Sequence, residues 1–203
     1  MKKLMLMITA ICSIVLCASK CNETPTLTAN EIVVENTIST DREAMFLKVG
    51  DNYRWYETCI KLNDWLDEEC DGSFEMVVNV FQAIVDVDDH SADTYVYKFQ
   101  HTTDGVNTES IHGFWVEDCP LNEEAIVVTY EDAFEKVMAV NLPKPHTHNV
   151  VLRKMVGPVD ANPQWIFGNL SEQIYVDAVT GEVSDENPAF KGYGFKMPLG
   201  EWP

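Results

Sequence analysis

Residues 74–117 constrain the fold most, because three apolar runs alternate there with turn-forming residues. The first run, residues 74–87, carries apolar side chains on both faces, which is typical of a central strand covered on each side. Tyr95, Tyr97 and Phe99 alternate in the second run, residues 94–101, and residues 109–117 form the third. Asp-Asp-His-Ser and Thr-Thr-Asp-Gly separate the runs and are typical of turns. The pattern predicts an antiparallel meander.

Residues 119–203 carry a second pattern, in which a helix precedes strands. Thr129 is a predicted N-cap with Asp132 at the capping-box position. One apolar stripe follows at helical spacing, formed by Ala133, Phe134, Val137 and Met138. Apolar runs at 150–152, 165–167 and 174–176 then predict three strands. Asp177 and Gly181 fit a turn, because Asp accepts amide hydrogen bonds and Gly tolerates positive φ.

Residues 175–183 read Tyr-Val-Asp-Ala-Val-Thr-Gly-Glu-Val. This segment resembles the end of the repeat in PepSY-like modules of secreted bacterial proteins, and the likeness covers about the last third of the chain. The resemblance implies a helix followed by three antiparallel strands. Some PepSY-containing proteins are linked with protease inhibition, so it also implies a regulator of an envelope protease as an alternative function.

Residues 44–62 allow two interpretations. Residues 44–49 and 53–62 predict a hairpin with Gly50, Asp51 and Asn52 at its tip. Trp55, Cys59, Leu62 and Leu66 also fall at helical spacing, so a helix over 54–68 is the alternative. Tyr, Trp, Thr and Ile in the first half of the run favour the strand.

The N-terminus is typical of an export signal. Lys2 and Lys3 precede an apolar run at residues 4–16, which is too short for a comfortable membrane span. We therefore predict a signal peptide at residues 1–20 and a polar linker at 21–40. Residues 16–21 resemble a bacterial lipoprotein signal in which Cys21 would carry the lipid, although Lys20 departs from the usual small residue.

The cysteines depend on this export prediction. Cys12 and Cys17 leave with the signal peptide, and disulfides are permitted outside the cytoplasm. Cys21, Cys59, Cys70 and Cys119 remain. A lipid on Cys21 leaves one bridge and one spare thiol, whereas four thiols allow three connectivities. Cys59–Cys70 closes the shortest loop and is the first candidate disulfide.

The charge of the chain excludes some partners. The 203 residues carry 14 basic and 33 acidic side chains, a net charge of −19, and loss of Lys2, Lys3 and Lys20 makes it more negative. Nucleic acid and anionic membrane surfaces need clustered Lys and Arg, so both are disfavoured. Cationic peptides and proteins remain compatible, and so does a purely solubilising role for the charge.

Few residues indicate chemistry. His146 and His148 would point the same way in a strand and are the best metal candidates, although no third ligand is evident. Acidic clusters at 64–71 and 86–89 lack the calcium-loop spacing. Nucleophile-elbow, zinc-protease and phosphate-loop motifs are absent from the sequence. We therefore predict no enzymatic activity and no cofactor.

Trp165 and Phe167 share one face of a predicted strand. That face either belongs to the core or forms an exposed aromatic patch suited to a protein, peptide or glycan.

The sequence as a whole predicts an α+β protein of mostly antiparallel sheet, with a sheet unit at residues 41–118 and a PepSY-like unit with an aromatic tail at 119–203. The predicted function is a non-catalytic binding or scaffold module of the cell envelope. The alternatives are the protease regulator and a metal-binding envelope protein.

Overall fold

A computed structural model describes residues 32–88, 91–116, 118–169 and 171–193. The predicted signal peptide, Cys21 and most of the predicted linker lie outside these residues. The elements in chain order are α1 (Val34–Val49), β1 (Tyr53–Leu62), β2 (Phe74–Asp88), β3 (Ser91–Thr102), β4 (Gly105–His112), β5 (Asp118–Cys119), η1 (Glu123–Ala125), α2 (Tyr130–Ala139), β6 (Asn149–Met155), β7 (Gln164–Gly168), β8 (Gln173–Asp177), β9 (Val183–Ser184) and η2 (Pro188–Phe190). The protein is therefore α+β and dominated by sheet.

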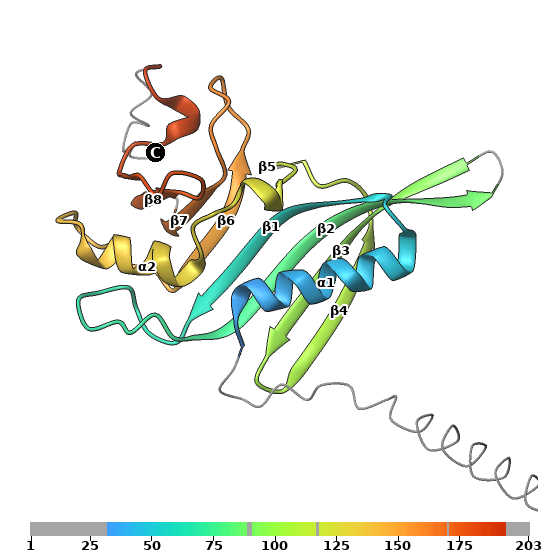
Figure 1. The fold of residues 1–203 in the computed structure, drawn as a ribbon, viewed down its shortest axis with the longest axis horizontal. Helices are drawn as coiled ribbons and strands as arrows, with labels where there is room; N and C mark the ends of the chain where they lie inside the picture. Colours follow the sequence, from blue (N-terminus) through green and yellow to red (C-terminus); the bar gives the residue numbers. More distant parts are fainter. Residues whose placement is uncertain (1–31, 89–90, 117, 170, 194–203) are drawn as a thin grey trace, which may run out of the picture.

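One antiparallel sheet runs through both halves of the chain in the order β4-β3-β2-β1-β6-β7-β8-β9, and β5 pairs with β6 beside it. Each half has a helix followed by a meander, and the first strands of the two meanders, β1 and β6, pair at the centre (Figure 1). Cys59 pairs with Val151 in that central contact. The two predicted units therefore share one continuous sheet.

The meander predicted over residues 74–117 is confirmed as β2, β3 and β4. The bounds predicted for its third strand, 109–117, are wrong, because β4 spans Gly105–His112 and residues 114–116 lie outside it. The run at 53–62 is β1, as its aromatic and β-branched residues favoured, so the helical alternative is wrong. The predicted strand at 44–49 is also wrong, because these residues belong to α1. Helix α1 begins at Val34, inside the predicted linker, and Gly50 ends it with φ 60°.

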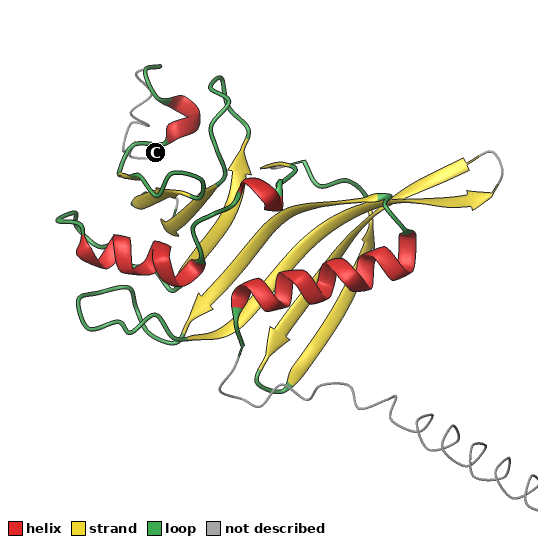
Figure 2. Cartoon of the chain, in the orientation of Figure 1, coloured by secondary structure: helices red, strands yellow, loops and turns green. Residues whose placement is uncertain are grey.

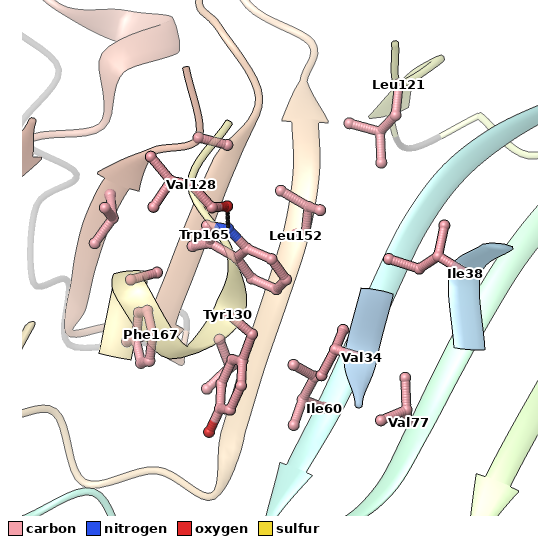
Figure 3. Packing of buried hydrophobic residues seen from close by; sticks show 14 of the residues in the cluster. Val34, Ile38, Ile60, Val77, Leu121, Val128, Tyr130, Leu152, Trp165 and Phe167 are labelled. Carbon is pink, nitrogen blue, oxygen red and sulfur yellow. Dashed lines mark hydrogen bonds between the residues drawn. The ribbon is translucent and has the colours of Figure 1, made fainter. Parts of the chain in front are cut away.

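Both helices pack on the same face of the sheet (Figure 2). Val34 and Ile38 of α1 belong to one buried cluster with Ala133 and Val137 of α2. Figure 3 shows this cluster, to which the strands contribute Ile60, Val77, Leu152, Trp165 and Phe167. Removal of this apolar surface from water is the main stabilising contribution to such a fold. No helix in the described part of the chain is long and apolar enough to span a membrane.

The local signals in the second half are confirmed. The Thr129 side chain accepts a hydrogen bond from the Asp132 amide and caps α2. Asp177 Oδ1 accepts from the amides of Val179 and Thr180, each at 2.9 Å, and Gly181 has φ 72°. Helix α2 followed by β6, β7 and β8 is also the order that the resemblance to PepSY-like modules implies, although membership in that group stays a prediction.

The exposed-patch interpretation of Trp165 and Phe167 is wrong. Their side chains are 1% and 0% exposed, on the face that the helices cover. Trp165 Nε1 donates to the Val128 carbonyl at 2.9 Å, so the one polar atom of this buried indole is satisfied (Figure 3). These residues are core.

Candidate functional site

The two halves of the sheet differ on the face opposite the helices, which we call the open face. In the second half, Met155, Ile166 and Tyr175 point to this face, and Ala189 of η2 packs over them. In the first half, Val80 and Val96 point to it and are buried. No helix among the described residues covers these two side chains. Another segment of the chain must therefore shield them.

Trp115 lies over this part of the open face, where it contacts the neighbours of Val80 and Val96 on β2 and β3. Its amide donates to Gln82 Oε1 of β2 at 2.6 Å, and its indole Nε1 donates to Asp118 Oδ2 at 3.3 Å. Lys98 Nζ of β3 lies 5.8 Å from the centre of the Trp115 ring, a cation–π contact. Trp115 is therefore fixed against β2 and β3 from the open side.

The neighbours of Trp115 are exposed although they are apolar. Phe114 is 72% and Val116 is 79% exposed, and Ile84 of β2 and Ile111 of β4 are 54% and 45% exposed. Ile111 of β4 lies opposite Val96 of β3, and Val96 lies opposite Gln82 of β2. Gln82 accepts the hydrogen bond from the Trp115 amide. We call Ile84, Ile111, Phe114 and Val116 the apolar patch. Ile84 and Ile111 lie on the strands beside Trp115, and Phe114 and Val116 flank it in the sequence. Groups of exposed apolar residues mark interaction sites more often than single exposed residues do.

Strand β4 borders the apolar patch and is the edge of the sheet. All eight of its residues are exposed, and β3 is its single partner among the described strands. The opposite edge, β9, has two residues. Among the residues that the structure describes, the first half of the sheet thus has both exposed apolar side chains and a long edge strand with one partner.

A buried cluster of charged groups lies on the open face at the centre of the sheet. Glu57 of β1 pairs with Arg153 of β6, and Asp118 of β5 lies beside them with Oδ1 3.6 Å from Arg153 Nε. The pKa of Glu57 is raised to about 7, chiefly by burial and also by the charge of Asp118 and its hydrogen bond to Glu57, whereas the Cys59 thiol and Arg153 oppose the rise. One carboxyl group of this cluster can therefore hold a proton near neutral pH.

Cys59 is part of the same cluster. Its Sγ donates to Glu57 Oε1 at 2.8 Å. Burial, and then the negative charge of Glu57, raise the pKa of the Cys59 thiol. Thiolate is the reactive form of cysteine, so this thiol is a poor nucleophile at neutral pH. The cluster holds charge and protons rather than presenting a nucleophile.

A second polar network lies on the helix side of the first half. Asp41 Oδ2 of α1 accepts from Asn79 Nδ2 at 2.7 Å and contacts His101 Nε2 at 2.8 Å. Asn79 also donates to Thr37 and accepts from Thr58 Oγ1. All five residues are at most 2% exposed. A network buried this deeply fixes α1 to β1, β2 and β3, and substrate does not reach it.

The structure brings His146 and His148 together, but around an indole. The ring centres of His146 and His148 lie 3.7 Å and 3.8 Å from the ring centre of Trp65. No three His, Cys, Asp or Glu residues are placed to hold a metal ion within the ranges that the structure describes. The described geometry therefore gives the predicted metal site no third ligand.

The predicted Cys59–Cys70 disulfide is wrong, since both residues are free thiols, as is Cys119. Cys59 faces the open side, because its neighbour Ile60 belongs to the core under the helices, whereas Cys70 lies in that core. The sheet separates the two sulfur atoms. Cys21 lies outside the described residues.

Sequence reasoning missed the apolar patch and the Glu57 cluster. The apolar run Phe114, Trp115 and Val116 predicts a strand, and this pattern does not indicate that Phe114 and Val116 are exposed. Glu57 and Arg153 lie 96 positions apart in the sequence, and only the pairing of β1 with β6 joins them.

Comparison of this chain with protein-family models, with curated proteins and with solved structures found no match.

Proposed function

We propose that this chain is an exported, non-catalytic binding module of the cell envelope, and that it docks a protein partner on the apolar patch. The observation that carries the proposal is the exposure of Phe114 and Val116 beside Ile84 and Ile111, over strands that no described helix covers. Exposed apolar surface on an acidic chain costs solubility, and burial against a partner removes that cost.

The chemistry of the described residues supports binding over catalysis. The network around Asp41 is buried, as are Glu57 and Asp118, and the Cys59 thiol stays protonated at neutral pH because its pKa is raised. A catalytic group has to reach substrate, usually in an open pocket. A cavity of about 140 Å³ between α1 and the centre of the sheet has mostly apolar walls, and its acidic residues Glu35 and Glu123 contact the Tyr130 amide and Arg42.

Export is proposed from the sequence. Lys2, Lys3 and the apolar run at residues 4–16 support it, and Cys21 is the candidate for lipid attachment. A lipid at Cys21 would tether the module to a membrane surface that its net negative charge would otherwise repel. A PepSY-like relationship of the second half, with its link to protease regulation, remains a proposal resting on residues 175–183.

Site-specific photo-crosslinking in cells that produce the chain tests this function. A photoreactive amino acid replaces Phe114 or Val116 in separate variants, and the exposed Glu135 of α2 serves as the matched control position. We expect discrete adducts, stable to washing, from positions 114 and 116 and none from 135. Identical adducts at all three positions, or none at 114 and 116, would refute docking on the patch.

The same cells test the location and the kind of partner. The chain should fractionate with membranes, and Cys21→Ser should release it into the soluble exported fraction. A chain that stays in the cytoplasm would refute the export proposal. Identification of the adduct as an envelope protease would select the regulatory alternative.

A further inference from the structure

Strand β4 presents a row of backbone groups that pair with no other described strand. It pairs with β3 from Gly105 to His112 without a register shift, and the Gly113 amide continues the ladder by donating to the Thr94 carbonyl at 2.9 Å. In an antiparallel pair, alternate residues direct both backbone groups to the partner strand. The odd-numbered residues of β4 therefore bond to β3. Val106, Thr108, Ser110 and His112 direct their N–H and C=O groups outward.

This edge lacks the features that usually block strand addition. Proteins protect an edge with lysine, proline, a bulge or a very short strand. Within residues 105–112 there is no lysine, proline or register shift, and the strand has eight residues. The two-residue β9 shows the short form of protection at the other edge. The contrast singles out β4 as the open edge.

The charge on β4 restricts what can pair with it. Glu109 is its one acidic residue, and it lies on the open face because it pairs with Lys98, whose ammonium contacts Trp115 there. Glu109 forms no ion pair with a basic group among the described residues. A cationic side chain directly opposite Glu109 in an added strand would be stabilising, and an acidic one would be destabilising.

A second copy of the chain fits poorly for that reason. The antiparallel register that uses all four outward residues pairs Val106 with His112 and Thr108 with Ser110 of the copy. It also places Glu109 opposite Glu109. Each copy carries a net charge of −19, so repulsion at long range adds to this local contact.

We propose that β4 binds an extended basic segment of a partner protein by antiparallel strand addition. The segment places Lys or Arg opposite Glu109 and an apolar residue opposite Ile111. Residues two apart in a strand share a face, so both side chains lie on the open face beside the apolar patch. Main-chain hydrogen bonds to Thr108 and Ser110 provide affinity. The side chains opposite Glu109 and Ile111 provide specificity. The inference rests on the proposed binding function and names the chemistry of the partner.

Synthetic peptides and proline variants test the proposal. The probe is a labelled, end-capped peptide Thr-Val-Thr-Lys-Thr-Val-Thr, which reads the same in both directions, and its control has Glu in place of Lys. Fluorescence anisotropy at protein concentrations up to about 1 mM covers the weak affinity expected of a short peptide. We expect the Lys peptide to bind at least about ten times more tightly than the Glu peptide, a ratio that corresponds to about 1.4 kcal/mol.

Ser110→Pro removes one outward N–H and leaves the hydrogen bonds to β3 intact, as proline is tolerated at such edge positions. It should weaken binding of the Lys peptide at least about tenfold, whereas Ser110→Ala should not. Thr108→Pro provides a second test if the first variant unfolds at a lower urea concentration. Glu109→Lys should reverse the preference between the two peptides.

Three results would overturn the inference. The first is that the Lys peptide does not bind the wild-type chain. The second is that both proline variants still bind it as tightly as the wild type. The third is a dimer in sedimentation equilibrium that Ser110→Pro dissociates, with no binding of either peptide. Crosslinking at Phe114 distinguishes this failure from failure of the proposed function. Adducts that persist in Ser110→Pro would keep docking on the patch and exclude strand addition.

Discussion

Glu57→Gln should change how stability depends on pH. Burial and Asp118 raise the pKa of Glu57 from 4.5 to about 7 in the folded chain, whereas the unfolded chain keeps an ordinary value. Between these two values the folded state holds a proton that the unfolded state has released. Stability falls with rising pH wherever the folded state binds more protons. Glu57 therefore makes the wild type progressively less stable from about pH 4.5 to above pH 7.

The magnitude follows from the size of the shift. One pKa unit corresponds to about 1.36 kcal/mol, so a rise from 4.5 to about 7 corresponds to about 3 kcal/mol at full ionisation. Glu57 is 7% exposed, so solvent screens this effect little. Glutamine keeps the shape of protonated glutamate and cannot ionise. Because part of this change falls below pH 5, the stability of Glu57→Gln relative to wild type should increase by about 2.5 kcal/mol between pH 5 and pH 8.

Urea denaturation of both proteins at half-unit pH intervals measures this difference directly. Taking the difference cancels groups common to both proteins, including Asp177, whose pKa is lowered by hydrogen bonds from backbone amides despite the opposing effect of burial. Glu75→Gln is the matched control, because Glu75 forms an exposed pair with Lys61 on the neighbouring strand, and such pairs contribute less than about 1 kcal/mol. A wild-type-to-Glu57→Gln difference that stays constant within about 0.5 kcal/mol from pH 5 to 8 would refute the assignment.

Two further predictions concern the buried network and the cysteines. Asp41→Ala leaves His101 Nε2 without its acceptor and removes one of the two acceptors of Asn79. It should lower the free energy of unfolding, measured in urea, by about 3 kcal/mol. A loss below about 1 kcal/mol would show that the network adds little to stability. Peptide mapping after alkylation of the unreduced, unfolded chain should find Cys59 and Cys70 as separate alkylated peptides, and a peptide joining the two would restore the disulfide interpretation.

The strands and α2 were predictable because their signals are local. Tyr95, Tyr97 and Phe99 alternate with the two-residue period of a strand, and this alternation requires no distant partner. Thr129 and Asp132 mark the start of α2 three residues apart, within a single turn. In these segments propensity, pattern and burial agree, which is the condition under which sequence reasoning works.

Helix α1 was missed because its buried face is partly polar. Val34, Ile38 and Met45 point to the sheet at helical spacing, but Thr37 and Asp41 lie between them and are equally buried. A pattern search reads these two residues as solvent-facing, since buried Asp is rare without a partner. The partners are Asn79 and His101, which lie 38 and 60 positions away. Sheet pairing sets that proximity, so no short window of sequence contains it.

Trp165 illustrates the opposite limit, in which the strand was correct and the face was undecided. Alternation places Trp165 and Phe167 together but does not say which face of the sheet the helices cover. Both helices cover the same face, and that face takes all the large aromatic residues of β7. The exposed apolar residues Ile84, Ile111, Phe114 and Val116 belong to the first half instead, whereas Trp165 and Phe167 are buried. A sequence without the sheet order could not choose between these two surfaces.

The similarity of the two halves makes their difference informative. Each half places a helix and then a meander on one shared sheet, so equal coverage of the open face would be expected from topology alone. The second half is covered there, because Ala189 packs on Ile166 and Tyr175, and its edge ends in the short β9. The first half has Trp115 as its described cover and β4 as a full-length edge. Ile84, Ile111, Phe114 and Val116 therefore lie in the half whose edge strand is long and has one partner among the described strands. This coincidence supports β2, β3 and β4 as the proposed binding surface.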